Sequence, residues 1–89
     1  MPTVCLLITG KVQGVFYRAT AKRKANELDI TGWIKNTREG NVEATVSGNE
    51  RQLNEFINWC KRGPDRAIVE KVIVSDTEDM VFEGFAVLR

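Results

Sequence analysis

A short segment that is punctuated by glycines and ends in an arginine is the part of this chain best suited to chemistry. It reads Gly10-Lys11-Val12-Gln13-Gly14-Val15-Phe16-Tyr17-Arg18, and it lies between an apolar run, Val4 to Ile8, and a helix-like stretch, Ala19 to Leu28. Backbone N–H groups in such a turn converge at a helix N-terminus, where unpaired donors and the helix dipole favour an anion. Gly10 and Gly14 permit backbone angles and close approaches that a Cβ would block.

Arg18 adds a planar, permanently charged fork to this turn. A guanidinium can pair with two oxygens of a phosphoryl group at once, so the segment predicts a phosphoryl-binding loop. A plain strand-to-helix corner with a surface arginine is the alternative, and the segment alone leaves both interpretations open. Lys22 follows one helical turn later; one hypothesis is that it adds positive potential at the site, and the simpler interpretation is a solvated helix face.

Asn36 is the second candidate for chemistry. From Ile30 to Asn36 the hydrophobic period falls to two, which is typical of a strand with Ile30 and Ile34 facing the core and Trp33 facing the other side. Asn36 has the same parity as the isoleucines, so a polar amide is expected to point inward at the end of a strand. It is either a turn-forming residue that bonds to local backbone or a functional group at the rim of the core.

The two segments together resemble the signatures of the acylphosphatase family. Its first motif reads roughly Gly-x-Val-Gln-Gly-Val-x-Phe-Arg. The second is Gly-aromatic-small apolar-x-Asn, followed after three residues by Gly-x-Val and after five more by Gly. Both are present in order, the second as Gly32 to Asn36 with Gly40, Val42 and Gly48. Tyr17 replaces the usual Phe and Ile34 the usual Val or Ala, and the closing residues 85–89 look like the family's last strand.

This resemblance implies hydrolysis of acyl phosphates to a carboxylate and inorganic phosphate, without a metal or another cofactor. Phosphoryl transfer depends mainly on positioning and electrostatic stabilisation, and a carboxylate leaves without needing a general acid. Arg18 and the loop backbone would hold the phosphoryl oxygens, and Asn36 would orient the attacking water, with Thr37 beside it. The substrate-binding residues expected on this basis are Gln13, Gly14, Val15, Phe16, Tyr17 and Arg18, and the catalytic ones are Arg18 and Asn36.

Two other classes of protein use the same order of elements. A single-strand RNA binder expects aromatic and basic residues on the third strand, whereas residues 41–46 contain none. A regulatory or assembly domain that only binds a small anion would keep the loop and Arg18. Asn36 distinguishes this alternative from an enzyme, because holding an anion does not require a water-positioning amide.

Composition limits the remaining classes. The chain has 89 residues, which predicts a single domain over residues 1–89, and 13 basic side chains balance 12 acidic ones, which argues against a nucleic-acid partner. It contains no histidine, so imidazole acid–base chemistry and histidine metal ligation are excluded. Cys5 and Cys60 are interpreted as core thiols, and no apolar run approaches membrane-spanning length. We expect a cytoplasmic monomer whose partners are a small acyl phosphate and inorganic phosphate, with no membrane.

The periodicity predicts a ferredoxin-like α/β sandwich of the α+β class: β-α-β-β-α-β plus a short fifth strand, in a mostly antiparallel sheet with two helices on one face. Trp33 then lies on the uncovered face, while the first strand is expected to be covered at least partly on both faces. Asn49 and Gln52 resemble a capping box, and Gly63-Pro64 ends the second helix. The expected strands span residues 4–8, 30–36, 42–47, 67–74 and 81–88, with a solvated acidic loop over 75–79.

Overall fold

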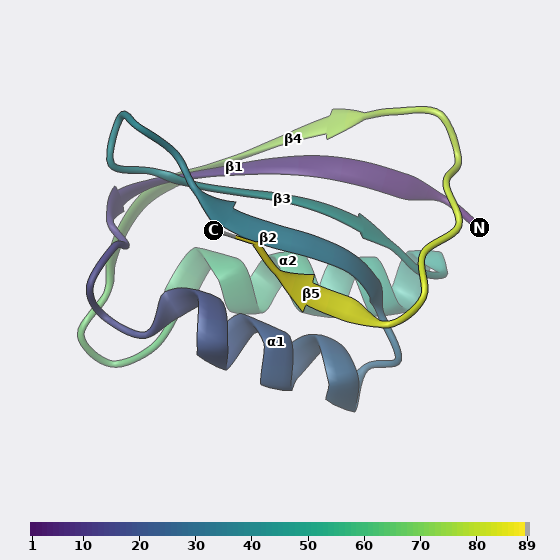
Figure 1. Ribbon diagram of the computed structural model, residues 1–89, viewed down its shortest axis with the longest axis horizontal. Helices are drawn as coiled ribbons and strands as arrows, with labels where there is room; N and C mark the ends of the chain where they lie inside the picture. Colours follow the sequence, from purple (N-terminus) through teal and green to yellow (C-terminus); the bar gives the residue numbers. More distant parts are fainter. Residues whose placement is uncertain (89) are drawn as a thin grey trace.

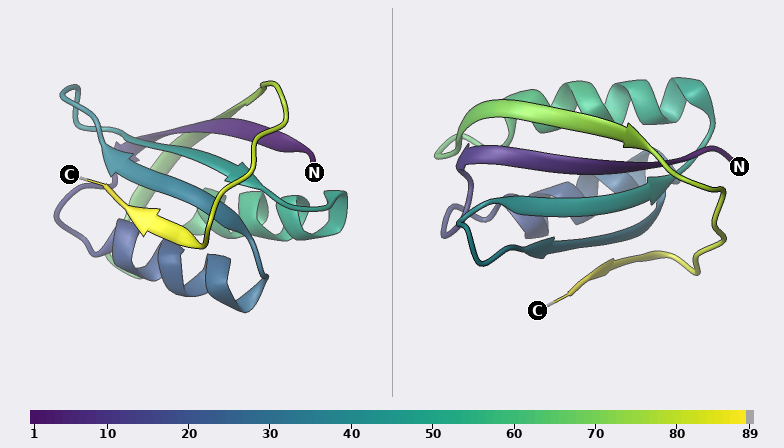
Figure 2. Two further views of the ribbon diagram at one scale, coloured as in Figure 1. Left: turned by 45° about the vertical axis from the view of Figure 1, so that its right-hand side comes forward. Right: turned by 90° about the horizontal axis from the view of Figure 1, so that it is seen from above.

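The computed structural model describes residues 1–88, which form two helices and five strands in one sheet (Figure 1). The elements are β1 (Thr3–Lys11), α1 (Tyr17–Glu27), β2 (Thr31–Asn36), β3 (Val42–Ser47), α2 (Glu50–Arg62), β4 (Ile68–Asp76) and β5 (Phe85–Val87). The strand order is β4-β1-β3-β2-β5, and every neighbouring pair is antiparallel except β2 and β5. Both helices pack on the same face of the sheet (Figure 2). The α+β, ferredoxin-like sandwich expected from the sequence is confirmed.

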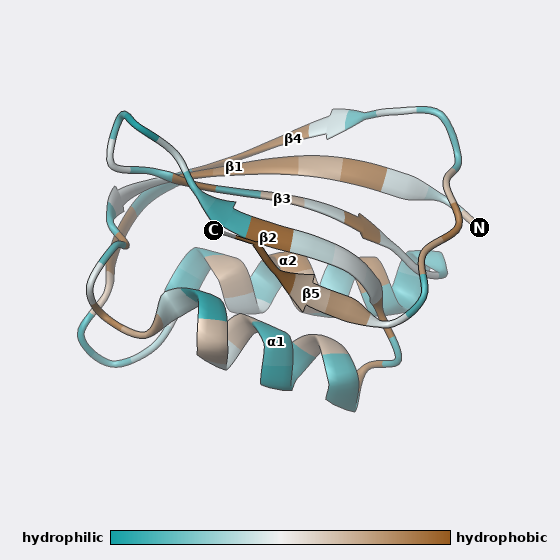
Figure 3. Cartoon of the chain, in the orientation of Figure 1, coloured by the Kyte–Doolittle hydropathy of each residue, from teal (hydrophilic) through white to brown (hydrophobic). Residues whose placement is uncertain are grey.

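The core lies between this sheet and the two helices, because each element presents an apolar side there. Helix α2 buries Leu53, Phe56 and Cys60 at the spacing of one helical stripe, and its capping box at Asn49 and Gln52 is formed as expected. Helix α1 buries the smaller Ala21 and Ala25. Its hydrophilic residues are the teal segments of this helix in Figure 3. Neither helix is long and apolar enough to cross a membrane over the part of the chain that the structure describes.

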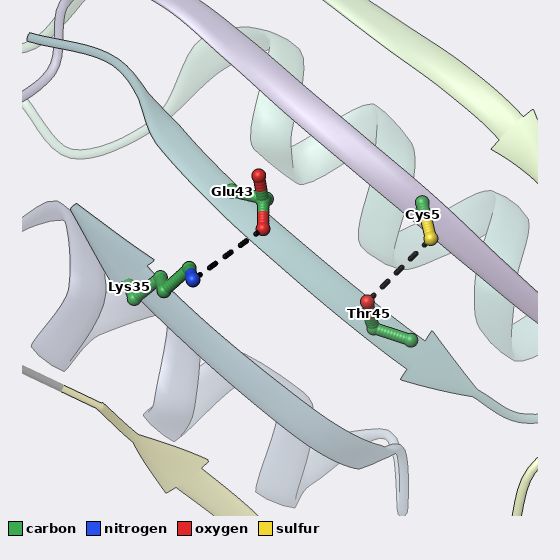
Figure 4. Close-up of polar contacts among 4 residues, drawn as sticks. All are labelled: Cys5, Lys35, Glu43 and Thr45. Atoms are coloured by element: carbon green, nitrogen blue, oxygen red, sulfur yellow. Dashed lines mark hydrogen bonds and ion pairs between the residues drawn. The ribbon is translucent and has the colours of Figure 1, made fainter. Parts of the chain in front are cut away.

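Among residues 1–88, no helix or strand covers the opposite face of the sheet, which corrects two expectations for β1. This strand is central, but its odd-numbered side chains lie on the open face, so Cys5 is half-buried and only Cys60 is a core thiol. The Cys5 Sγ atom lies 3.5 Å from Thr45 Oγ1 on β3 (Figure 4). Trp33 is on the same face, as predicted, where the Lys35 Nζ atom is 5.4 Å from the centre of its ring. The unbroken apolar run of β1 therefore reflects its central position rather than two covered faces.

The last strand is much shorter than the expected 81–88. Strand β5 contains only Phe85–Val87 and pairs in parallel with Gly32 to Ile34 of β2. Val81 is 98% exposed, so the apolar residues before Gly84 do not belong to the sheet. Strand β4 extends to Asp76, which takes the first two residues of the expected acidic loop into the sheet. Arg89, the last residue of the expected closing strand, lies outside the described residues.

Candidate active site

Gly10 creates the sharp end of β1 that leads into the loop. The register between β1 and β4 shifts between Thr9 and Gly10, so the two backbones approach closely at this bulge. A Cβ on Gly10 would overlap the carbonyl oxygen of Ile68 and would lie 2.8 Å from the backbone nitrogen of Glu70. The absence of a side chain at Gly10 is therefore a steric requirement of the turn.

The loop itself turns through two residues with left-handed backbone angles. Gly14 has φ 74° and Phe16 has φ 63°, and Phe16 is the residue immediately before α1. The Phe16 carbonyl accepts bonds from the backbone and hydroxyl of Thr20, whereas the Phe16 side chain caps nothing and its residue surface is 75% exposed. Left-handed angles are costly for a residue with a side chain, and they recur at functional sites.

This geometry leaves a run of unpaired donors. Within residues 1–88, the backbone N–H groups of residues 14–19 donate no hydrogen bond to another residue. Unpaired N–H groups at the first turn of a helix attract negative charge, because the helix dipole adds to their own partial charges. The loop expected to bind a phosphoryl group therefore has its donors available.

The side chains of Tyr17 and Val15 do not belong to the site, although both residues lie in the predicted loop. Tyr17 is buried, its hydroxyl donates a 2.7 Å hydrogen bond to the carbonyl of Cys60, and its ring lies 5.3 Å from that of Trp59. The extra hydroxyl relative to phenylalanine thus has a partner in the core, and burial raises the Tyr17 pKa. Val15 is also buried. Tyr17 and Val15 can contribute only backbone atoms to an anion site.

The side chain of Gln13 has a structural contact that sequence reasoning missed. Its Nε2 atom donates two hydrogen bonds of 2.8 Å, to the carbonyl oxygens of Thr37 and Asn41. These two residues form the turn between β2 and β3, where the Asn41 N–H also bonds to Thr37 Oγ1. Gln13 therefore connects the loop to the turn that follows Asn36. No local sequence pattern predicts a contact between segments so far apart in the chain.

Arg18 and Asn36 both line one groove, which has a volume of about 550 Å³. Arg18 lies in the first turn of α1, and its Nη1 atom donates a 3.3 Å bond to the carbonyl of Leu88, beyond β5. Asn36 is the last residue of β2 and enters the same groove. The groove also contains residues from the loop and from α1 and β5: Val12, Gly14, Phe16, Tyr17, Ala19, Lys22 and Val87.

The side chain of Asn36 has an unsatisfied acceptor. Its Oδ1 atom is buried and has no hydrogen-bond partner among residues 1–88. A buried acceptor without a partner costs about 1–3 kcal/mol, so its presence at the end of β2 calls for an explanation other than stability of the fold. The turn is instead held by Gln13 and Thr37, which contradicts the interpretation of Asn36 as a residue that bonds the local backbone.

The charges in the groove are positive. Arg18 and Lys22 both line it, and no carboxylate does so among the residues that the structure describes. Residues 1–88 also contain no group of three or more His, Cys, Asp or Glu side chains that could hold a metal ion. The groove therefore combines a guanidinium, an ammonium and free N–H donors with one buried amide oxygen.

Comparison with known proteins gives consistent similarities. Residues 4–87 match the family model described as Acylphosphatase. A Methylococcus capsulatus protein named Acylphosphatase is 43% identical over 93 residues, covering 100% of this chain and 98% of that protein. One from Marinobacter nauticus with the same name is 46% identical over 80% of this chain and 77% of its own length.

Solved structures are similar over the whole fold. The crystal structure of acylphosphatase from Bacillus subtilis superposes with a TM-score of 0.96 at 27% identity and covers 100% of both chains. The structure of an acylphosphatase from Coxiella burnetii has a TM-score of 0.94 at 33% identity, covering 98% of this chain and 92% of the other.

Proposed function

Because this chain belongs to the acylphosphatase family, we propose that the groove lined by Arg18 and Asn36 is the site of the family's reaction. The enzyme hydrolyses acyl phosphates to a carboxylate and inorganic phosphate. One observation carries the assignment of the site: the loop with its free N–H donors, the Arg18 guanidinium and the Asn36 amide line a single groove. Donors and positive charge stabilise a transferring phosphoryl group, and an amide can position the water.

The phosphoryl group binds to the backbone N–H groups of the loop and to Arg18. The bound oxygens then satisfy donors that no residue within 1–88 satisfies. The Arg18 guanidinium pairs with two oxygens, and its contact with the Leu88 carbonyl helps to fix its orientation. These donors stabilise the charge that spreads over the phosphoryl oxygens as the bond to the leaving carboxylate lengthens.

Asn36 orients the attacking water with its side-chain amide, which lines the groove. The water oxygen forms a bond to phosphorus while the bond from phosphorus to the acyl oxygen breaks, and the electron pair leaves with the carboxylate. The water's proton passes to a phosphoryl oxygen of the substrate. Asn36 itself does not titrate, so its role is geometric.

Nothing in the groove favours a domain that only binds an anion. The loop donors and Arg18 are sufficient to hold an anion, so an anion-binding domain would not need an amide at the end of β2. The Asn36 amide in the same groove is useful when a water must be placed next to the phosphoryl group.

The proposal includes the setting in which the enzyme acts. The loop, Arg18 and Asn36 line one groove of a single chain, so the proposed chemistry needs no residue from a second copy, and we propose a monomer that acts as a single domain over residues 1–89. Cys5 and Cys60 are free thiols, which supports a reducing compartment such as the cytoplasm. No metal takes part, since the carboxylate leaving group needs no Lewis acid.

The purified chain should consume benzoyl phosphate, as followed by the loss of ultraviolet absorbance, and a chelator should not change the rate. Inorganic phosphate should inhibit competitively, because the loop binds the oxygens of the product as it binds those of the substrate. Absence of hydrolysis would contradict the proposed function. A requirement for added metal would contradict the mechanism.

A further inference from the structure

Lys22 is a second cation in the groove, and the phosphoryl-binding role does not account for it. It lies one helical turn beyond Arg18 on α1, which places both side chains on the same helix face, about 6 Å apart along the axis. Lys22 makes no ion pair with another residue that the structure describes. The next two basic residues are not free cations of this groove. Arg23 does not line it, and the Lys24 Nζ atom forms an ion pair with Glu27 Oε2 at 3.6 Å.

The groove is larger than a phosphoryl group needs. Its volume of about 550 Å³ is that of a site for a whole small molecule. Between the loop and Lys22 its lining is mainly apolar, with Phe16, Ala19 and Val87. With the phosphoryl group bound at the loop, the acyl chain can extend along this apolar part, and Lys22 then lies one helical turn away from the reacting centre.

Building on the proposed function, we propose that Lys22 selects the acyl group: it pairs with a carboxylate at the far end of the acyl chain. The preferred substrate class is then the monoacyl phosphates of short dicarboxylic acids, of which succinyl phosphate is the probe. The hydrocarbon part contacts the apolar lining, and the two anionic ends pair with two cations about one helical turn apart. Acetyl phosphate, which lacks the second anion, gains nothing from Lys22 beyond its general potential.

The size of the effect follows from the exposure of Lys22. An ion pair open to solvent strengthens binding only about 1.4- to 5-fold, because water and salt screen it. The selectivity for the dicarboxylic substrate should therefore be modest and should appear in binding. Arg18 and Asn36, which act on the phosphoryl group and the water, serve both substrates equally.

The experiment compares kcat/KM for succinyl phosphate and acetyl phosphate in the wild type and in the Lys22→Gln, Lys22→Glu and Arg23→Gln variants. Arg23→Gln is the matched control, because it removes the same charge from the next position of α1, outside the groove. Lys22→Gln should lower the succinyl-to-acetyl ratio about 1.4- to 5-fold through KM, and Lys22→Glu should lower it further. Arg23→Gln should leave the ratio unchanged.

A second measurement needs no variant. In the wild type, the succinyl-to-acetyl ratio of kcat/KM should fall as salt rises from about 0.01 M to about 0.5 M, because salt screens the ion pair between Lys22 and the second carboxylate. Contacts that both substrates make with the enzyme do not affect the ratio. Equal losses for both substrates in the Lys22 variants, or an equal change in the Arg23 control, would overturn the proposal and leave the proposed function standing. Failure of the wild type to hydrolyse either substrate would overturn both.

Discussion

The side-chain amide of Gln13 donates a 2.8 Å hydrogen bond to the carbonyl oxygen of Thr37, the residue that follows Asn36. A second bond of the same length reaches Asn41. The loop proposed to bind the phosphoryl group and the strand end that carries the proposed water-positioning amide are thus joined by one side chain. We expect the relative position of substrate and water to depend on this contact.

Gln13→Ala should therefore weaken both stability and turnover. It removes one of two donors from each of two carbonyl oxygens, which keep their backbone bonds from Gly40 and Thr37, so the free energy of unfolding should fall by about 1 kcal/mol. Turnover of the folded fraction should also fall, because the turn next to Asn36 is released. Urea unfolding and kcat measured on one preparation test this, and a stable variant with wild-type kcat would show that the contact does not position Asn36.

Arg18→Lys should be severely impaired although the positive charge is kept. An ammonium cannot form the two parallel bonds of a guanidinium, and the loss in transition-state stabilisation should reach about 2–4 kcal/mol. The matched control is Arg23→Lys, the same substitution on an exposed position of α1. Steady-state kinetics with phosphate as inhibitor test the prediction, and near-normal kcat/KM in Arg18→Lys would refute paired binding by the guanidinium.

Stability should fall between pH 8 and pH 10 because of Cys60. Burial raises the pKa of this thiol from 9.0 to about 12. Above pH 9 the unfolded chain has lost the thiol proton while the folded chain keeps it, so the unfolded state is favoured as pH rises. The loss should be about 1 kcal/mol by pH 10, measured by urea unfolding at each pH. Cys60→Ala should flatten this dependence, and a wild-type curve that is flat over this range would contradict the account.

The sequence predicts the fold well where the signals are local. The capping box at Asn49, the stripe of α2 and the inward parity of Asn36 each depend on neighbours a few residues away. Prediction fails where an element depends on a distant partner. The extent of β5 is set by the three residues of β2 with which it pairs, and the apolar residues before Gly84 do not indicate that pairing.

The same distinction between local and distant contacts applies to the candidate site. The loop, Arg18 and Asn36 are predictable because motif spacing and strand parity place them, whereas the Gln13 contact joins segments 24 residues apart. Cys5 shows the same limit, since a central strand looks equally apolar whether helices cover one face of the sheet or both. Which face stays open is decided by tertiary packing.

Asn36→Ala tests the central claim most directly, because Asn36 is assigned to the water and not to the phosphate. The variant should lower kcat and kcat/KM together by about 10² or more, while inhibition by phosphate changes little. Its free energy of unfolding should not fall and should rise by up to about 1–3 kcal/mol, since the variant removes a buried acceptor, Asn36 Oδ1, that has no partner within residues 1–88. Turnover, phosphate inhibition and urea unfolding of one preparation give all three values. A folded Asn36→Ala enzyme with wild-type kcat would contradict the account, because the attacking water would then be positioned by another group.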